Sequence, residues 1–170
     1  KRKIVFLSGM TFFLMVFQAW LGATVVFSVL QPVKITIHML MALVILALMV
    51  YLISEVPEPS KEKNIIFDKR LHQFLKIAIV LSLIQITLGT QVRQLIDEIA
   101  SSLNHIQRDL WVDLAGTTFK IHRSFAISLV LINVMLFIRN YKLKYRYQLV
   151  NFVCGVLFLE VLSGVLLTYF

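Results

Sequence analysis

Residues 18–43 read QAWLGATVVFSVLQPVKITIHMLMAL, two apolar runs joined by a short segment around Pro32. A hydrocarbon core about 30 Å thick takes about 20 apolar residues to span as a helix. Five stretches of the chain are long enough, at about 4–30, 34–53, 71–92, 118–138 and 147–170. The hydrophobic content of 59% also exceeds the roughly 45–50% of soluble domains. We therefore predict an all-α, polytopic membrane helix bundle with five transmembrane helices.

The opening stretch also contains a motif that recurs along the chain. A glutamine or glutamate is followed four residues later by a glycine, so the two residues share one face of a helix. In two of the three copies a histidine follows in the next apolar stretch. The copies comprise Gln18, Gly22 and His38, then Gln85, Gly89 and His122, and finally Glu160 and Gly164. Close helix packing is the leading interpretation of the glycine pairs, and contact with a porphyrin edge is the alternative. The role of Glu160 is left open.

The basic residues predict the orientation of the chain. The net charge is +8, and 12 of the 17 lysines and arginines fall before the first helix, between the second and third, or before the fifth. The positive-inside rule then predicts a cytoplasmic (or matrix) N-terminus and an outer C-terminus. We expect an integral protein of the bacterial plasma membrane or the mitochondrial inner membrane. The charge is explained by this topology, so the lipid bilayer is the expected partner and nucleic acid is not.

The connections predict two tandem repeats. Pro57 and Pro59 lie in a charged segment, 55–70, that we interpret as a cytoplasmic linker between a domain at 1–54 and one at 71–170. In the second domain, residues 94–117 form a predicted outer loop whose apolar residues recur every three or four positions. This pattern favours an amphipathic segment lying on the outer membrane surface. An ordinary surface helix without a role in a site is the alternative.

Two of the four histidines are candidate metal ligands. His38 and His122 each lie about one turn inside the outer end of a predicted membrane helix. Ionisable residues inside a membrane are rare and usually face the interior of the bundle, and neutral imidazole is a standard axial ligand of haem iron. We therefore predict that both are axial ligands of haem iron, with a hydrogen bond to a neighbouring helix as the alternative. His72 and His105 are expected to be solvated at the membrane surface.

Two arginines are candidates for binding the haem periphery. Arg123 follows the second histidine, and Arg93 lies at the outer end of the third predicted helix. A guanidinium group can pair with a carboxylate such as a haem propionate. Both residues can instead be interfacial anchors or partners of Asp97 and Glu98. The single cysteine, Cys154, excludes an internal disulfide.

The motifs together resemble the haem A synthase family of cytochrome-oxidase assembly enzymes. The resemblance covers nearly the whole chain and is most specific in the strings GTQVR and IHRSF. It is carried by QAWLGATVV at 18–26, ITIHMLMAL at 35–43, LGTQVRQLIDEIA at 88–100, IHRSFAISLVLIN at 121–133 and LEVLSGVLLTYF at 159–170.

The resemblance implies an eight-helix membrane oxidoreductase made of two related four-helix halves. Such an enzyme carries a haem b cofactor and oxidises a methyl group of haem O to the formyl group of haem A. By this match His38 is the ligand of the fourth helix and His122 that of the sixth. Haem O synthase and cytochrome-oxidase assembly proteins are the partners it suggests.

The chain also departs from the family pattern. It resembles helices three to seven only, without counterparts of the first two helices, their acidic residue, or the eighth helix. We therefore expect a fragment that is inactive alone, and no catalytic residue is assigned. Two other functions stay open: a b-type cytochrome subunit for electron transfer, and a non-redox transport or assembly subunit.

Overall fold

The structure is a computed structural model that describes residues 2–28, 31–55, 68–143 and 147–169. Its regular elements are all helical. They are α1 (Arg2–Phe27), α2 (Pro32–Ser54), α3 (Lys69–Ser102), α4 (Arg108–Tyr141) and α5 (Gln148–Tyr169). All five are long and apolar enough to cross a membrane. The predicted fold class is therefore confirmed, while most of the predicted linker, residues 56–67, lies outside the described part of the chain.

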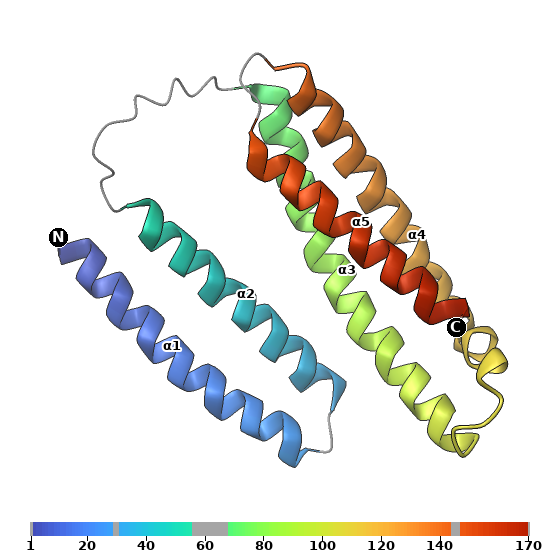
Figure 1. The fold of residues 1–170 in the computed structure, drawn as a ribbon. Helices are drawn as coiled ribbons and strands as arrows, with labels where there is room; N and C mark the ends of the chain where they lie inside the picture. Colours follow the sequence, from blue (N-terminus) through green and yellow to red (C-terminus); the bar gives the residue numbers. More distant parts are fainter. Residues whose placement is uncertain (1, 29–30, 56–67, 144–146, 170) are drawn as a thin grey trace. The chain divides into compact units, whose positions relative to one another are not determined.

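The chain divides into two units, Lys1–Asn64 and Ile65–Phe170. In the first unit, α1 and α2 form an antiparallel pair (Figure 1). Pro32 is the first residue of α2, where a missing backbone N–H costs nothing because that position has no partner inside the helix. The short connection forces α2 back along α1, which places the polar residues of the two helices beside each other.

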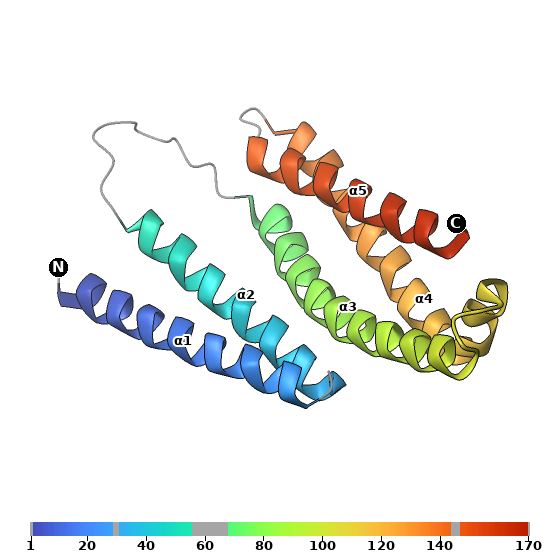
Figure 2. The same cartoon turned by 60° about the horizontal axis from the view of Figure 1, so that its bottom comes forward.

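In the second unit, α4 packs against both α3 and α5 (Figures 1 and 2). The backbones of α3 and α5 make no close contact within the described residues. At one end of this unit, where α3 and α5 begin and α4 ends (called the inner end here because of the orientation predicted from the sequence), Leu71, Ala78 and Leu136 form a buried apolar cluster. Further along the helices, the separation of α3 and α5 leaves space on one side of α4.

Polar contacts hold the inner end of the second unit together. Asp68 caps α3 by accepting a hydrogen bond from the Leu71 N–H at 2.7 Å, and it also pairs with Arg139 of α4, Nη2 to Oδ2, at 2.5 Å. The hydrogen bond from Arg139, followed by the one from Leu71, lowers the pKa of the Asp68 carboxyl. Asn140, which is 0% exposed, exchanges hydrogen bonds with the backbone of Tyr147 across the turn to α5. Side chains as well as apolar packing therefore join the start of α3 to the end of α4, and the end of α4 to the start of α5.

Residues 94–117, which the sequence predicts as an outer loop, are mainly helical. The helix α3 continues to Ser102, and α4 already begins at Arg108, so the connection between them is short. Gly116 interrupts α4 with φ of 52° and ψ of −123°, which only glycine adopts at low cost. The part of α4 before this kink turns aside (Figure 2), and Arg108 donates a hydrogen bond at 3.5 Å to the carbonyl of Leu167 near the end of α5. The amphipathic periodicity of 94–117 therefore belongs to two helical segments.

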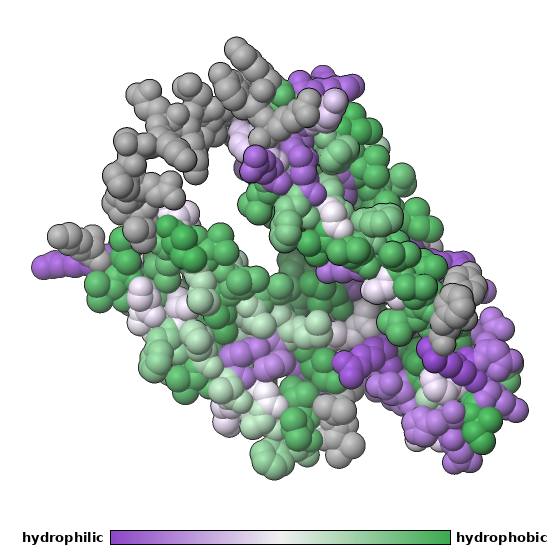
Figure 3. Space-filling model, in the orientation of Figure 1, coloured by the Kyte–Doolittle hydropathy of each residue, from purple (hydrophilic) through white to green (hydrophobic). Residues whose placement is uncertain are grey.

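Apolar side chains dominate the outer surface of each unit. Large side chains such as Phe12, Phe152 and Leu167 are 69%, 68% and 72% exposed. Figure 3 shows hydrophobic surface along the helices, with hydrophilic residues gathered near the ends of the α3–α4–α5 unit. An exposed apolar surface of this extent is unfavourable in water but is the expected surface of helices in lipid. The protein is therefore an integral membrane protein.

Candidate functional site

The first copy of the repeated motif forms a small polar cluster between α1 and α2. The Nε2 atom of Gln18 donates a hydrogen bond to the backbone carbonyl of His38 at 2.9 Å and lies 3.4 Å from the His38 Nε2 atom. Gly22, one turn further along α1, faces the same ring. A methyl group at Gly22 would lie 3.0 Å from His38 Cε1, closer than ordinary van der Waals contact. The glycine thus makes room for the imidazole, and the glutamine contacts it.

The second copy repeats this arrangement between α3 and α4. The Nε2 atom of Gln85 lies 3.2 Å from both ring nitrogens of His122. A methyl group at Gly89 would lie 3.4 Å from His122 Cε1. The two units therefore bring the same three residue types together on helices of different lengths, although only Gln18 also reaches the backbone of its histidine.

The kink in α4 explains how the glutamine meets the histidine in both copies although the sequence between them differs in length. Glutamine and histidine are separated by 20 residues in the first copy and by 37 in the second. Pro32 begins α2 and Gly116 begins the straight part of α4, and in each case the histidine follows after the same number of residues. All of the additional sequence in the second copy therefore lies between Gly89 and Gly116, outside the contacts of the site.

A cavity of about 640 Å³ lies beside His122 in the second unit. Its volume falls in the range of about 300–1,000 Å³ that is usual for ligand sites, and its wall is mainly apolar with a few polar groups. The residues around it come from all three helices of the unit. Among them are Gln85, His122, Arg123, Ala126, Glu160 and Gly164.

The third partial copy of the motif thus faces the second. Glu160 and Gly164 belong to α5 and line the same cavity as the His122 ring. Because α4 lies between α3 and α5, residues from both flanking helices reach the space on one side of it. Sequence reasoning identified the motif in α5 but gave no reason to expect it beside His122.

The two predicted arginines have different surroundings. Arg123 lines the cavity, and its guanidinium lies 6.0 Å from the centre of the Phe119 ring. Arg93 is not among the residues described around that cavity; its Nε lies 3.8 Å from Asp97, and both side chains are largely exposed. The structure therefore brings Arg123 and His122 together and places Arg93 in a surface ion pair. The predicted contact of either arginine with a cofactor stays a prediction.

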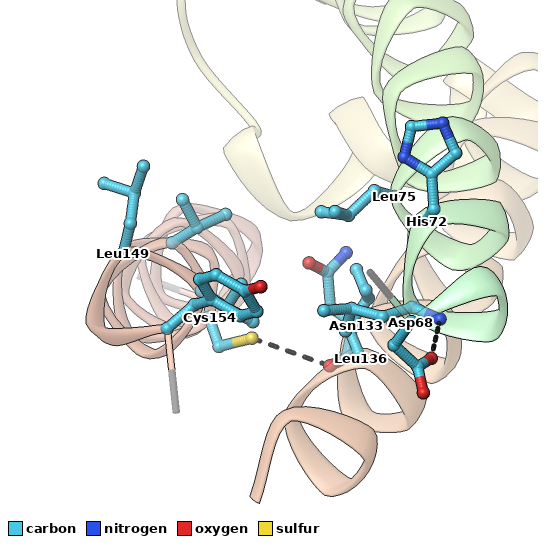
Figure 4. A pocket seen from close by; sticks show the side chains of 11 residues that line it. Asp68, His72, Leu75, Asn133, Leu136, Leu149 and Cys154 are labelled. Carbon is cyan, nitrogen blue, oxygen red and sulfur yellow. Dashed lines mark hydrogen bonds between the residues drawn. The ribbon is translucent and has the colours of Figure 1, made fainter. Parts of the chain in front are cut away.

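A second, smaller cavity of about 380 Å³ lies at the inner end of the same unit (Figure 4). The amide of Asn133 and the thiol of Cys154 lie between α3 and α5, where the thiol donates a hydrogen bond at 3.5 Å to the Asn133 carbonyl. His72 lines this cavity, and its side chain is exposed. His105, in the turn between α3 and α4, is also exposed. These two histidines lie apart from the motif contacts, as the sequence predicted for solvated residues.

Sequence reasoning missed the direct contact between glutamine and histidine. Helix packing was the leading interpretation of the Gln–Gly pairs, and a hydrogen bond to a neighbouring helix, without a named partner, was the alternative to iron ligation for the histidines. The equal spacing of both pairs was the available signal, since a glutamine and a glycine on one helix face can meet the same residue of the neighbouring helix. The structure joins them in one site.

Two similar clusters of a histidine, a glutamine and a glycine, each formed where two membrane helices meet, define a helical integral membrane protein with a repeated histidine motif. The comparison with known families specifies it further. The family model of the COX15-CtaA cytochrome oxidase assembly proteins matches residues 1–170, and the chain belongs to that family. No curated protein and no solved structure showed significant similarity to the chain.

Proposed function

We propose that the protein acts in the synthesis of haem A, oxidising a methyl group of haem O to a formyl group for use in cytochrome oxidase. Membership of a cytochrome oxidase assembly family supports this proposal. The observation that carries it is the repeated arrangement of a histidine, a glutamine and a glycine, with a cavity beside His122. We further propose that haem b is the resident cofactor and that haem O is the substrate.

The residues of the two sites fit a haem group. The buried Nδ1 atom of His38 has no hydrogen-bond partner among the described residues. An unsatisfied buried polar atom costs about 1–3 kcal/mol, and a bare imidazole nitrogen can bind iron, so this atom supports a metal ligand role for His38. No three His, Cys, Asp or Glu side chains gather into a metal-binding group within the described ranges. A metal on His38 or His122 would therefore take most of its ligands from elsewhere, as an iron porphyrin does.

The chain's own residues would bind and orient the haem groups. His38 and His122 would each supply one nitrogen ligand to a haem, and the haem iron would supply the oxidation chemistry. The apolar wall of the cavity at His122 would exclude water from the ring, which leaves few routes for competing reactions. Ala126, four residues after His122 on the same face of α4, keeps that wall free of a bulky side chain.

Arg123 would hold the negatively charged edge of a haem at the same cavity. Its guanidinium lies at the wall, and no acidic partner of it is described. A charge-assisted hydrogen bond to a propionate would orient the ring relative to His122. Arg93 would act in this way only after leaving Asp97, so Arg123 is the stronger candidate.

We also propose the setting of this activity. The charge distribution of the chain supports a cytoplasmic or matrix N-terminus in the bacterial plasma membrane or the mitochondrial inner membrane. Haem O synthase and other cytochrome-oxidase assembly proteins would be its functional partners, because the substrate is poorly soluble and its product is needed by the oxidase.

Comparison of His122→Ala with His72→Ala in the full-length protein tests the proposed site. We expect His122→Ala to lower the haem content strongly and His72→Ala to leave it close to wild type. Extraction of pigments after co-expression with a source of haem O then tests the reaction. Equal haem content in both variants would contradict the assignment of His122, and bound haem O without formation of haem A would contradict the enzymatic function.

A further inference from the structure

Glu160 is the only charged residue among the described residues of α5, a helix long and apolar enough to cross the membrane. A carboxyl group inside a membrane is costly, and it usually faces a cavity or a partner and marks a functional site. Within the described residues the Glu160 carboxyl makes no hydrogen bond or ion pair; only its backbone carbonyl accepts one, from the Ser163 hydroxyl at 2.8 Å. The residue lines the cavity beside His122 instead.

A contact between α4 and α5 fixes the level of Glu160 relative to His122. The Cys154 thiol lies 3.5 Å from the Asn133 carbonyl, so these two residues stand at one level of the antiparallel helices. Six residues outward from them along each helix come Glu160 and Ile127, which both line the cavity. His122 lies five residues beyond Ile127, about 7 Å further along the axis at about 1.5 Å per residue. Glu160 therefore belongs to the inner part of the cavity.

The outer part of the cavity carries the opposite charge. Arg123 follows His122 and, by the same counting, stands level with Gly164 of α5. A methyl group at Gly164 would meet nothing within 4 Å in the described structure, whereas one at Gly22 or Gly89 would meet an imidazole. The third copy of the motif therefore adjoins open space, with a guanidinium toward its outer end and a carboxyl toward its inner end.

These two charges would act differently on a haem in the cavity. Ferric haem carries one more positive charge than ferrous haem, and little water enters a cavity with a mainly apolar wall. A nearby carboxylate therefore stabilises the ferric form, because Coulomb interactions are stronger where water does not screen them. The negatively charged propionates are attracted by Arg123 and repelled by Glu160, so the ring would bind with its propionate edge outward.

We propose that Glu160 is a positioning residue of the haem site at His122, whose negative charge directs the propionate edge of the ring toward Arg123 and favours ferric iron. This inference rests on the proposed function, since it requires haem at His122. The other two copies of the motif have a neutral glutamine at the same position, Gln18 or Gln85. The charge is thus particular to the copy that faces the cavity.

The test removes this charge from the full-length protein without changing the size of the side chain. Glu160→Gln should favour the ferrous state about 10-fold, the effect of one charge at about 10 Å in a protein, which raises the midpoint potential by about 59 mV. Arg123→Gln should lower the potential of the same haem. Glu98→Gln is the matched control, because the Glu98 carboxyl accepts a hydrogen bond from Gln94 on the surface, and it should leave the potential unchanged.

Glu160→Asp, which keeps the charge, should retain its haem with a potential near wild type. Opposite shifts in Glu160→Gln and Arg123→Gln would support the inference, because general damage to packing does not change sign with the charge that is removed. An unchanged potential in Glu160→Gln, shifts of one sign in both variants, or loss of haem in Glu160→Asp would overturn it. If His122→Ala left the haem spectrum unchanged, the proposed function would fail instead, and this inference with it.

Discussion

Adding a single methyl group at Gly22 tests whether the glycines of the motif exist to admit the histidine rings. In Gly22→Ala the new carbon would lie 3.0 Å from His38 Cε1, whereas carbon atoms pack best at about 3.5–4.0 Å. The imidazole must retreat by a few tenths of an ångström, away from the contacts that Gln18 makes with it. The substitution therefore disturbs the position of the ring directly.

The size of the effect follows from two opposing contributions. Overpacking of this kind costs about 1–3 kcal/mol, while alanine is favoured over glycine within a helix by about 1 kcal/mol. We expect Gly22→Ala to lower the free energy of unfolding by up to about 2 kcal/mol. The corresponding distance at Gly89 is 3.4 Å, close to ordinary contact, so Gly89→Ala should be nearly neutral.

Denaturant unfolding in detergent micelles, together with measurement of haem content, provides the assay. Gly9→Ala is the matched control on α1, since a methyl group there meets nothing within 4 Å in the described structure, and it should be neutral or slightly stabilising. If Gly22→Ala were as stable as Gly9→Ala and retained all of its haem, the steric reasoning would be wrong. A larger loss at Gly89 than at Gly22 would also contradict it.

Two further predictions concern the inner end of the second unit. The hydrogen bond from Arg139 lowers the pKa of Asp68 in the folded protein. The ionised Asp68 therefore stabilises the fold above the ordinary aspartate pKa. This stabilisation is lost as the pH falls from that value through the lowered pKa. Unfolding measured against pH should show a gap between wild type and Asp68→Asn that closes in acid, and a gap independent of pH would refute this. Asn140→Leu should cost about 1–3 kcal/mol, because it removes the buried amide that accepts the Tyr147 N–H. Faster maleimide labelling of the half-buried Cys154 should report the loosened α5, and unchanged labelling would contradict the role given to Asn140.

The sequence predicted the fold class because the signal is local. Each membrane helix is a run of apolar residues, and a run can be recognised without knowledge of its neighbours. The end of α3 was predicted too early for a related reason. Charged residues such as Arg93 and Asp97 end the apolar run but not the helix, which continues to Ser102.

The candidate site was predictable only in part. The two histidines stood out because ionisable residues are costly in lipid, and the structure places Arg123 on the same cavity as His122. The cavity itself depends on how α3 and α5 pack on either side of α4, which no local pattern specifies. Glu160 lies at this cavity because of that packing, which the neighbouring residues in the sequence do not specify.

Because Gly116 breaks the helix, the directions of the side chains before residue 116 do not determine the directions of those in the membrane helix that follows. In an unbroken helix, one inserted residue would turn every later side chain by about 100° about the axis, and His122 would no longer face Gln85. With the helical path reset at Gly116, residues before the break can be gained or lost without changing which way the imidazole points. The segment before Gly116 can therefore diversify while the face of α4 that carries His122 keeps its angular position.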